Sequence, residues 1–413
     1  MAGAPVVAGW LALVGVALWW GSSAIAGRGL AINAPPLAGT WGWHASPRIV
    51  APALLAVTIV IIGPRLAAEL RWRQLTIISG GAAAAWTLLL AASDGWRRVT
   101  EPLATPHEYE PFAADIGSAA SFLRDFVERL PYTPIHVQGH PPGAPLVPWL
   151  LDRVGLDGAG WFAALVILGW AVAVVAALVA ARGVAGETAA RRAAPALVLL
   201  PAALWAGTSA DGLFAGVLAV GVALLVAERA AWAPIGGLVV AAGLLLTYGA
   251  LALLGIPILV LLRQRRLRRL AIGVGTTVAA LAAFWVVTGF SWLDGLAATR
   301  AAYHDGVAEE RPWTYFALVG NPAALALAIG PAVTVGLVAA VRRWATPEAL
   351  LPLAGVAVVG AANASLLSKG EVERIWLPFV PWLALAAPGD RRTWLIVQAA
   401  LALVLQAWLR SKW

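Results

Sequence analysis

The chain has 413 residues, of which 61% are hydrophobic and 12% carry a charge, with a mean hydropathy of +0.81. These values exclude a soluble globular domain, which must cover its core with polar side chains. The net charge of +8 would favour a nucleic-acid partner in a soluble protein, but here the basic residues stand in short segments between apolar runs, as membrane topology requires. Because no cysteine is present, disulfides, thiolate metal sites and cysteine nucleophiles are excluded.

Apolar runs that could form membrane helices recur along the whole chain. They begin near Val6, Ile49, Leu75, Trp161, Ala193, Leu213, Ile235, Leu251, Leu270, Ala323, Leu350, Ile375 and Trp394. The stretch from Val239 to Leu262 contains Tyr248, Gly249 and Pro257, and we expect a kinked helix or two half-helices there. With roughly 20 apolar residues needed for a span, the sequence predicts an all-α transmembrane bundle of about 12 to 13 spans.

The basic residues of the short loops predict the orientation. They form five groups: Arg65, Arg71 and Arg73; Arg182, Arg191 and Arg192; Arg263, Arg265, Arg266, Arg268 and Arg269; Arg342 and Arg343; Arg391 and Arg392. We expect these loops in the cytoplasm. The alternate loops, with most acidic residues and all five histidines, then face the outside of the cell membrane.

Two of the predicted outer loops are long, covering residues 94–160 and 291–321. Within the first, apolar residues recur at helical spacing from Phe112 to Leu130, which predicts an amphipathic helix in the membrane interface. A short apolar segment, Ala144 to Leu151, follows it. Surface chemistry, if the chain performs any, is expected on these loops.

The first loop carries the carboxylates that could act as a general base. Asp94 follows the third apolar run, and Glu108 and Glu110 follow it at a distance, flanked by His107 and Tyr109. A carboxylate partly shielded at a membrane surface can have a raised pKa and accept a proton during catalysis. The alternative is that these acids only hydrate the loop.

Two further segments could bind a substrate. His140 is followed by Pro141 and Pro142, which hold the backbone rigid, although the segment could equally be a plain helix start. Lys369 and Arg374 stand in a late outer loop, where cations could bind an anionic headgroup or be paired with Glu371 and Glu373 in a salt-bridged cap. Asp211 is interpreted as the N-cap of the run from Leu213.

Three of these segments resemble the GT-C superfamily of membrane glycosyltransferases, in particular the branch of the protein mannosyltransferases and aminoarabinose transferases (families 39 and 83). Glu108-Tyr109 is similar to the acidic first outer loop of that family. His140-Pro141-Pro142-Gly143 is similar to its His-Pro-Pro-Leu, and Ser368 to Ala386 is similar to a late segment with an arginine and a prolyl helix start. The likeness covers residues 75–413, with residues 1–74 as two additional N-terminal transmembrane helices.

The resemblance implies a sugar transfer from a polyprenyl-phosphate-sugar donor to a glycan, lipid or protein acceptor outside the membrane. It implies Glu108 as the catalytic base, with Asp94 as the runner-up. It also implies that Lys369 and Arg374 bind the phosphate, that His140 binds the phosphate or the acceptor, and that His107, Tyr109, Glu110 and Glu373 lie at the substrate. No cofactor and no metal ligand is assigned, and a requirement for a divalent metal stays open, as do the sugar and the stereochemical outcome.

Two other functions are compatible with this sequence. A lipid flippase or small-molecule transporter would need broken helices and charges inside the spans, whereas here the charges gather in the outer loops. A non-catalytic lipid-binding protein would keep the same loops without turnover. No phosphate-binding loop of the Walker type and no zinc-ligand spacing is present in the sequence.

Overall fold

The computed structural model describes residues 3–27, 30–306, 311–365 and 367–413. It is an all-α structure with one very small sheet. The first half of the chain forms α1 (Ala4–Gly27), α2 (Val50–Glu69), α3 (Trp72–Ala92), α4 (Tyr109–Ala113), α5 (Ala119–Arg124), α6 (Phe126–Arg129), α7 (Ile135–Gln138), α8 (Gly143–Arg153), α9 (Ala159–Ala185) and α10 (Glu187–Val198).

The second half continues the bundle. It forms α11 (Ala203–Ala206), α12 (Asp211–Val226), α13 (Ala233–Leu244), α14 (Ala250–Leu253), α15 (Gly255–Arg263), α16 (Leu267–Thr288), α17 (Trp292–His304), α19 (Trp313–Tyr315), α20 (Asn321–Arg342), α21 (Pro347–Ala364), α22 (Val372–Ile375), α23 (Val380–Ala384) and α24 (Arg392–Trp408). Short 3-10 and π-helical turns lie between several of them.

Seven of the described helical segments are long and apolar enough to cross a membrane. They are Ala4–Ala24, Pro47–Glu69, Trp72–Ala92, Ala159–Ala185, Leu267–Thr288, Trp313–Arg342 and Pro347–Ala364. Four shorter apolar helical segments accompany them, at Asp211–Val226, Ala230–Leu244, Ala250–Arg263 and Arg392–Trp408. The chain therefore has the helices of a membrane protein.

The number of full-length spans is smaller than the sequence predicted, although every predicted apolar run contains helix. The run from Ala193 divides into α10 and α11 before and after Pro201, and the run from Ile375 divides into α22, a 3-10 turn at Leu377–Phe379, and α23. Proline removes a backbone donor and clashes with the preceding turn, which explains the breaks. The expected break between Val239 and Leu262 is confirmed, because α13 ends at Leu244 and α14 begins at Ala250.

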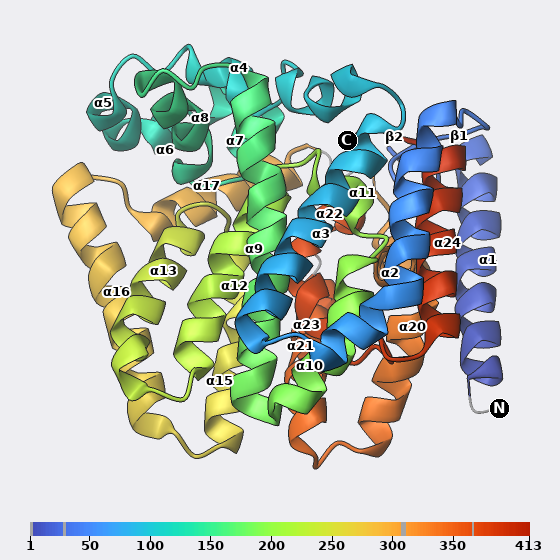
Figure 1. Cartoon of the computed structure of the whole chain (residues 1–413). Coiled ribbons are helices and arrows are strands. Elements are labelled where there is room, and N and C mark those ends of the chain that lie inside the picture. Colours follow the sequence, from blue (N-terminus) through green and yellow to red (C-terminus); the bar gives the residue numbers. More distant parts are fainter. Residues whose placement is uncertain (1–2, 28–29, 307–310, 366) are drawn as a thin grey trace.

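The outermost helices leave most of their apolar surface uncovered by the rest of the protein. Only 17% of the apolar window of α1 and 11% of that of α16 is buried, and these two helices stand at opposite edges of the bundle in Figure 1. Val286 and Val287 on α16 are 81% and 83% exposed. Such apolar surface is stable in lipid and costly in water.

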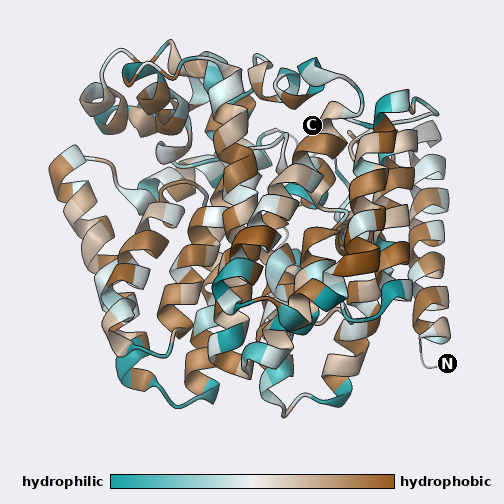
Figure 2. Ribbon diagram, in the orientation of Figure 1, coloured by the Kyte–Doolittle hydropathy of each residue, from teal (hydrophilic) through white to brown (hydrophobic). Residues whose placement is uncertain are grey.

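The two ends of the bundle differ in chemistry. The arginine-rich turns, which we call the basic end, lie at the bottom of Figure 1, and hydrophilic colour marks the turns between α15 and α16 and between α20 and α21 in Figure 2. The opposite end carries residues 96–153, from the 3-10 turn Trp96–Val99 to α8, which we call the cap. The basic end is the one that the arginine distribution predicts to be cytoplasmic.

The cap is built from short helices and not from the single amphipathic helix expected between Phe112 and Leu130. Gly117 lies in the break between α4 and α5, and Pro131 lies in the 3-10 turn after α6. The apolar residues of the predicted stripe still face inward. The ring of Phe126 lies 5.4 Å from Phe122 and 5.6 Å from Phe290, which joins the cap to the bundle.

One end of the cap fits tightly against the break between α13 and α14. A Cβ atom on Gly143 would lie 2.3 Å from the carbonyl oxygen of Leu245, so only glycine fits at the start of α8. The indole nitrogen of Trp292 donates to the carbonyl oxygen of Leu244, at 2.8 Å. The break therefore receives contacts from both the cap and α17.

On the other side of the same end, β1 (Gly39–Trp41) pairs antiparallel with β2 (Leu409–Ser411). The pairing consists of three residue pairs, from Gly39 with Ser411 to Trp41 with Leu409. It brings Trp413 beside the polar residues described below.

The absence of cysteine allows the orientation to be tested without background labelling. Tyr132 in the cap is 88% exposed and Arg268 is exposed at the basic end. In intact cells, a membrane-impermeant thiol reagent should modify the variant Tyr132→Cys and leave Arg268→Cys unmodified until the cells are opened. The reverse labelling pattern would show that the orientation is inverted.

Candidate active site

Four segments that are distant in the sequence meet where the cap contacts the bundle. They contribute Glu108 as the N-cap residue of α4, His136 on α7, Asp211 in the first turn of α12, and Arg374 on α22. All four side chains are buried or partly buried. We call these residues, with Tyr109, His140 and Glu371, the polar cluster.

The chain reaches the cluster from α21 through a tight turn. Gly370 and Glu371 both have positive φ angles, of 83° and 59°. A Cβ atom on Gly370 would lie 2.8 Å from the ring of Phe316, so this position requires glycine for its conformation and for its close packing. The turn directs α22 inward and places Arg374 in the interior.

Arg374 is the centre of the cluster. Its Nη1 donates to Oδ2 of Asp211 at 3.0 Å, and its Nη2 donates to Oε2 of Glu371 at 3.0 Å. Its guanidinium carbon lies 4.0 Å from the ring centroid of Trp413, a cation–π contact. Burial alone would lower the pKa of Arg374, but Asp211 and Glu371 raise it above its ordinary value, so the charge is permanent.

His136 connects Arg374 to the candidate base. Its Nδ1 lies 2.8 Å from Oε1 of Glu108, and its Nε2 lies 3.4 Å from Nη2 of Arg374. Since a guanidinium can only donate, Nε2 is the acceptor in its contact with Arg374. Nδ1 is close to the carboxylate but makes no hydrogen bond within the described residues. His136 therefore lies directly between the carboxyl group of Glu108 and the guanidinium of Arg374.

Tyr109 and His140 form the uncharged side of the cluster. The hydroxyl of Tyr109 lies 2.8 Å from Nδ1 of His140, and the same nitrogen lies 3.0 Å from the carbonyl oxygen of His136. Burial lowers the pKa of His140 to about 4 and raises that of Tyr109 well above its ordinary value. Both groups are therefore neutral hydrogen-bonding groups at physiological pH, and His140 supplies no positive charge.

Glu371 is held between two arginines. In addition to Arg374, it accepts from Nη2 of Arg311 at 2.6 Å. Burial raises the pKa of Glu371, but Arg374 and Arg311 outweigh burial and lower it to about 2. Lys412 also interacts with this carboxylate and lies 5.1 Å from the ring centroid of Trp413, so several cations gather here.

Asp94 makes its contacts outside the polar cluster. Its Oδ2 lies 3.3 Å from Nε2 of His44 and accepts from Nε2 of Gln406 at 3.1 Å. Asp94 and Trp413 line one small cavity of about 30 Å³. Trp413 therefore contacts Arg374 in the polar cluster and also borders the cavity that Asp94 lines.

The remaining residues singled out in the sequence lie around the cluster. Lys369 contributes backbone contacts, with its amide donating to the hydroxyl of Tyr303 at 3.1 Å and its carbonyl accepting from Arg311 at 2.6 Å. Glu373 accepts from the backbone amide of Ala38 at 2.9 Å, and burial raises its pKa to about 7.

Glu110 and His107 lie farther out. His107 is exposed. Burial and the neighbouring Asp152 raise the pKa of Glu110, which faces α8 and not Arg374. These two residues are not brought into the cluster.

Sequence reasoning missed His136, Arg311 and Trp413, and it interpreted Asp211 as a helix cap. Asp211 instead lies inside the first turn of α12, where it accepts from the hydroxyl of Ser209 at 2.7 Å and from Arg374. The available signal was its isolation: an acidic residue between two apolar runs needs a cationic partner when it is buried.

Among the described residues, no group of three or more histidine, cysteine, aspartate or glutamate side chains is arranged to hold a metal ion.

No known family model matches the chain, and no curated protein matches it either. The features that bear on function are therefore the geometry of the polar cluster and the short sequence resemblances.

Proposed function

We propose that the chain is a membrane glycosyltransferase of the GT-C type, which transfers a sugar from a polyprenyl-phosphate donor to an acceptor hydroxyl at the outer face of the cell membrane. The supporting observation is the arrangement of Glu108, His136 and Arg374 in one chain of contacts, beneath the cap and opposite the basic end. In that arrangement the carboxylate can accept the proton of the attacking hydroxyl, and the guanidinium can stabilise the negative charge on the leaving phosphate.

In the proposed reaction Glu108 accepts the proton of the acceptor hydroxyl. The hydroxyl oxygen forms a bond to the anomeric carbon, and the bond between that carbon and the phosphate oxygen breaks. The polyprenyl phosphate leaves with the electron pair. His136 holds Glu108 in position, and Tyr109 and His140 contribute neutral hydrogen bonds to the sugar or acceptor.

Arg374 is the proposed ligand of the donor phosphate. Its Nε makes no hydrogen bond within the described residues, which leaves a donor for a further oxygen. Glu371 could be displaced from Arg374 by the phosphate and still keep Arg311 as a partner. Lys369 and Lys412 would add positive charge at the same end, where a dianionic leaving group requires it.

The test is transfer from a polyprenyl phosphate that carries a labelled sugar. Purified protein in lipid vesicles should release polyprenyl phosphate and label an envelope extract that is supplied as acceptor, with hexose and pentose donors compared side by side. Donor binding without release would indicate a non-catalytic lipid-binding protein. Movement of intact donor across the vesicle membrane without release would indicate a transporter.

A further inference from the structure

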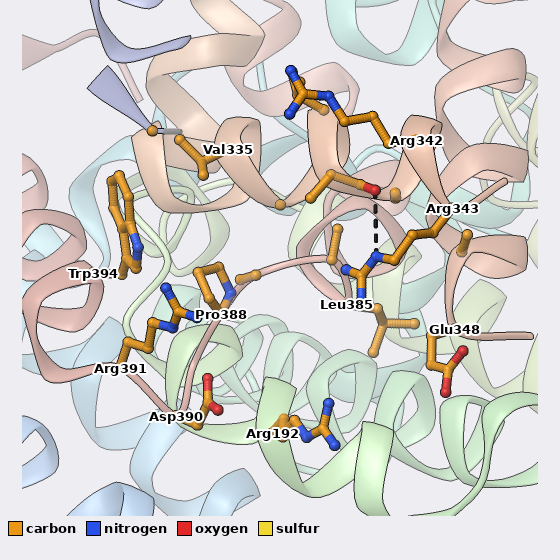
Figure 3. A pocket seen from close by; sticks show the side chains of 18 of the residues that line it. Arg192, Val335, Arg342, Arg343, Glu348, Leu385, Pro388, Asp390, Arg391 and Trp394 are labelled. Atoms are coloured by element: carbon orange, nitrogen blue, oxygen red, sulfur yellow. Dashed lines mark hydrogen bonds between the residues drawn. The ribbon is translucent and has the colours of Figure 1, made fainter. Parts of the chain in front are cut away.

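A second polar region lies at the basic end, far from the polar cluster. It is a cavity of about 870 Å³. Its charged lining comes from α10 (Arg192), from the end of α20 (Arg342 and Arg343) and from the residue before α24 (Arg391). Figure 3 shows Arg343 and Arg391 approaching it from opposite sides, with Arg192 below them.

The four arginines of this cavity have no carboxylate partner. None of them forms an ion pair within the described residues, and Arg343 donates only to the carbonyl oxygen of Ala339, at 3.4 Å. The lining contains these four arginines and two acidic residues, Asp390 and Glu348, so its net charge is +2. The excess of arginine that is general at cytoplasmic surfaces does not explain why four arginines line the same cavity.

Neighbouring arginines at the same end behave differently. Arg191 lies 2.6 Å from Oε1 of Glu187, and Arg65 lies 3.0 Å from Oε1 of Glu69. Acidic partners are therefore available at this end, and the cavity arginines stay without them. An unpaired cluster of guanidinium groups matches a phosphate, whose oxygens accept bidentate hydrogen bonds.

The rest of the lining is mostly apolar. Val6 on α1, Val335 on α20, Leu385 after α23 and Trp394 on α24 contribute to the same cavity. The helices α1 and α20 belong to segments long and apolar enough to cross a membrane, and α24 is a shorter apolar helix. Tryptophan is typical of the headgroup region of a bilayer, so a lining of arginines, apolar side chains and Trp394 is suited to the level where headgroups and acyl chains meet.

We propose that this cavity binds the phosphate headgroup of one anionic phospholipid, with the acyl chains against the apolar walls and the phosphate on the arginines. Basic pockets between membrane helices on the cytoplasmic side are suited to anionic lipid headgroups. The site is independent of sugar transfer, and it would tie the N-terminal helix α1 to α20 and α24 through a shared ligand.

The test compares three probes on the full chain in detergent: short-chain phosphatidylglycerol, phosphatidylcholine of the same chain length, and inorganic phosphate. Phosphatidylglycerol should bind saturably, and phosphatidylcholine should not. The double variant Arg343→Gln/Arg391→Gln should bind it about 30-fold more weakly, since each basic residue near an anionic headgroup contributes about 1 kcal/mol and 1.4 kcal/mol corresponds to tenfold.

The matched control is Arg73→Gln/Arg263→Gln, which removes the same charge from the basic end at two exposed positions outside the cavity lining. It should bind phosphatidylglycerol like the wild type. Equal weakening in both double variants, or none in the cavity variant, would overturn the site. Competition by inorganic phosphate at the affinity of the lipid would show a free-phosphate site and overturn the lipid assignment. Should the cavity double variant lose cooperative unfolding, the single variant Arg391→Gln replaces it, with about fivefold weaker binding expected.

Discussion

Glu108→Gln is expected to bind the donor lipid like the wild type and to transfer the sugar about 100- to 10,000-fold more slowly, because a glutamine cannot accept the acceptor proton. The substitution should keep the fold, since glutamine has nearly the shape of glutamate and still fits beside Nδ1 of His136, which lies 2.8 Å from Glu108. Donor affinity and the single-turnover rate are the two measurements. Binding and chemistry are thereby separated.

Glu110→Gln is the matched control for this prediction. Glu110 lies two residues farther along α4, half-exposed beside Asp152 and away from Arg374. Its variant should transfer at a near-normal rate. A near-normal rate in Glu108→Gln would move the role of base to Asp94, and a near-normal rate in Asp94→Asn as well would contradict the proposed mechanism.

Arg374→Lys is expected to weaken donor binding and to slow transfer together, because the phosphate contact exists in both the ground state and the transition state. A lysine keeps the charge but lacks the planar fork that contacts Asp211 and Glu371. Arg374→Ala would in addition leave the buried Asp211 without its cationic partner, while Glu371 would keep Arg311, and breaking a buried ion pair costs about 3 to 5 kcal/mol of unfolding free energy. The lysine variant is therefore the informative one, measured by donor titration and thermal unfolding.

The control is a second buried arginine, at the basic end. Arg269 is 7% exposed, against 6% for Arg374, and it donates to the carbonyl oxygen of Glu228 at 2.6 Å. Arg269→Lys should leave donor binding unchanged, whatever it does to stability. Equal donor affinity in Arg374→Lys and the wild type would exclude Arg374 as the phosphate ligand.

The helical membrane character of the chain could be predicted from local sequence alone, because apolar run length depends only on neighbouring residues. The number of full-length spans could not be predicted in this way. Pro201 and Pro378 interrupt runs that look continuous in hydropathy, and the resulting short helices are stabilised by the helices around them.

The polar cluster was predictable only in part, for a similar reason. Glu108, Tyr109, His140 and Arg374 stood out because each lies in a short local motif. Asp211 and Arg374 are separated by 163 positions in the sequence, and nothing near Asp211 indicates that partner. His136 carries no local signal either, since a single histidine next to apolar residues is compatible with any loop.

The tight fit of Gly143 against Leu245 has a mechanical consequence. On that side the cap cannot approach or tilt toward the bundle without a collision of backbone atoms, and the aromatic contacts from Phe122 through Phe126 to Phe290 attach it to the bundle. The ribbon of β1 and β2 lies outside the cap and holds the segment that carries Trp413 by three residue pairs. We therefore expect that a long-chain substrate enters past this ribbon, while the cap acts as a fixed wall.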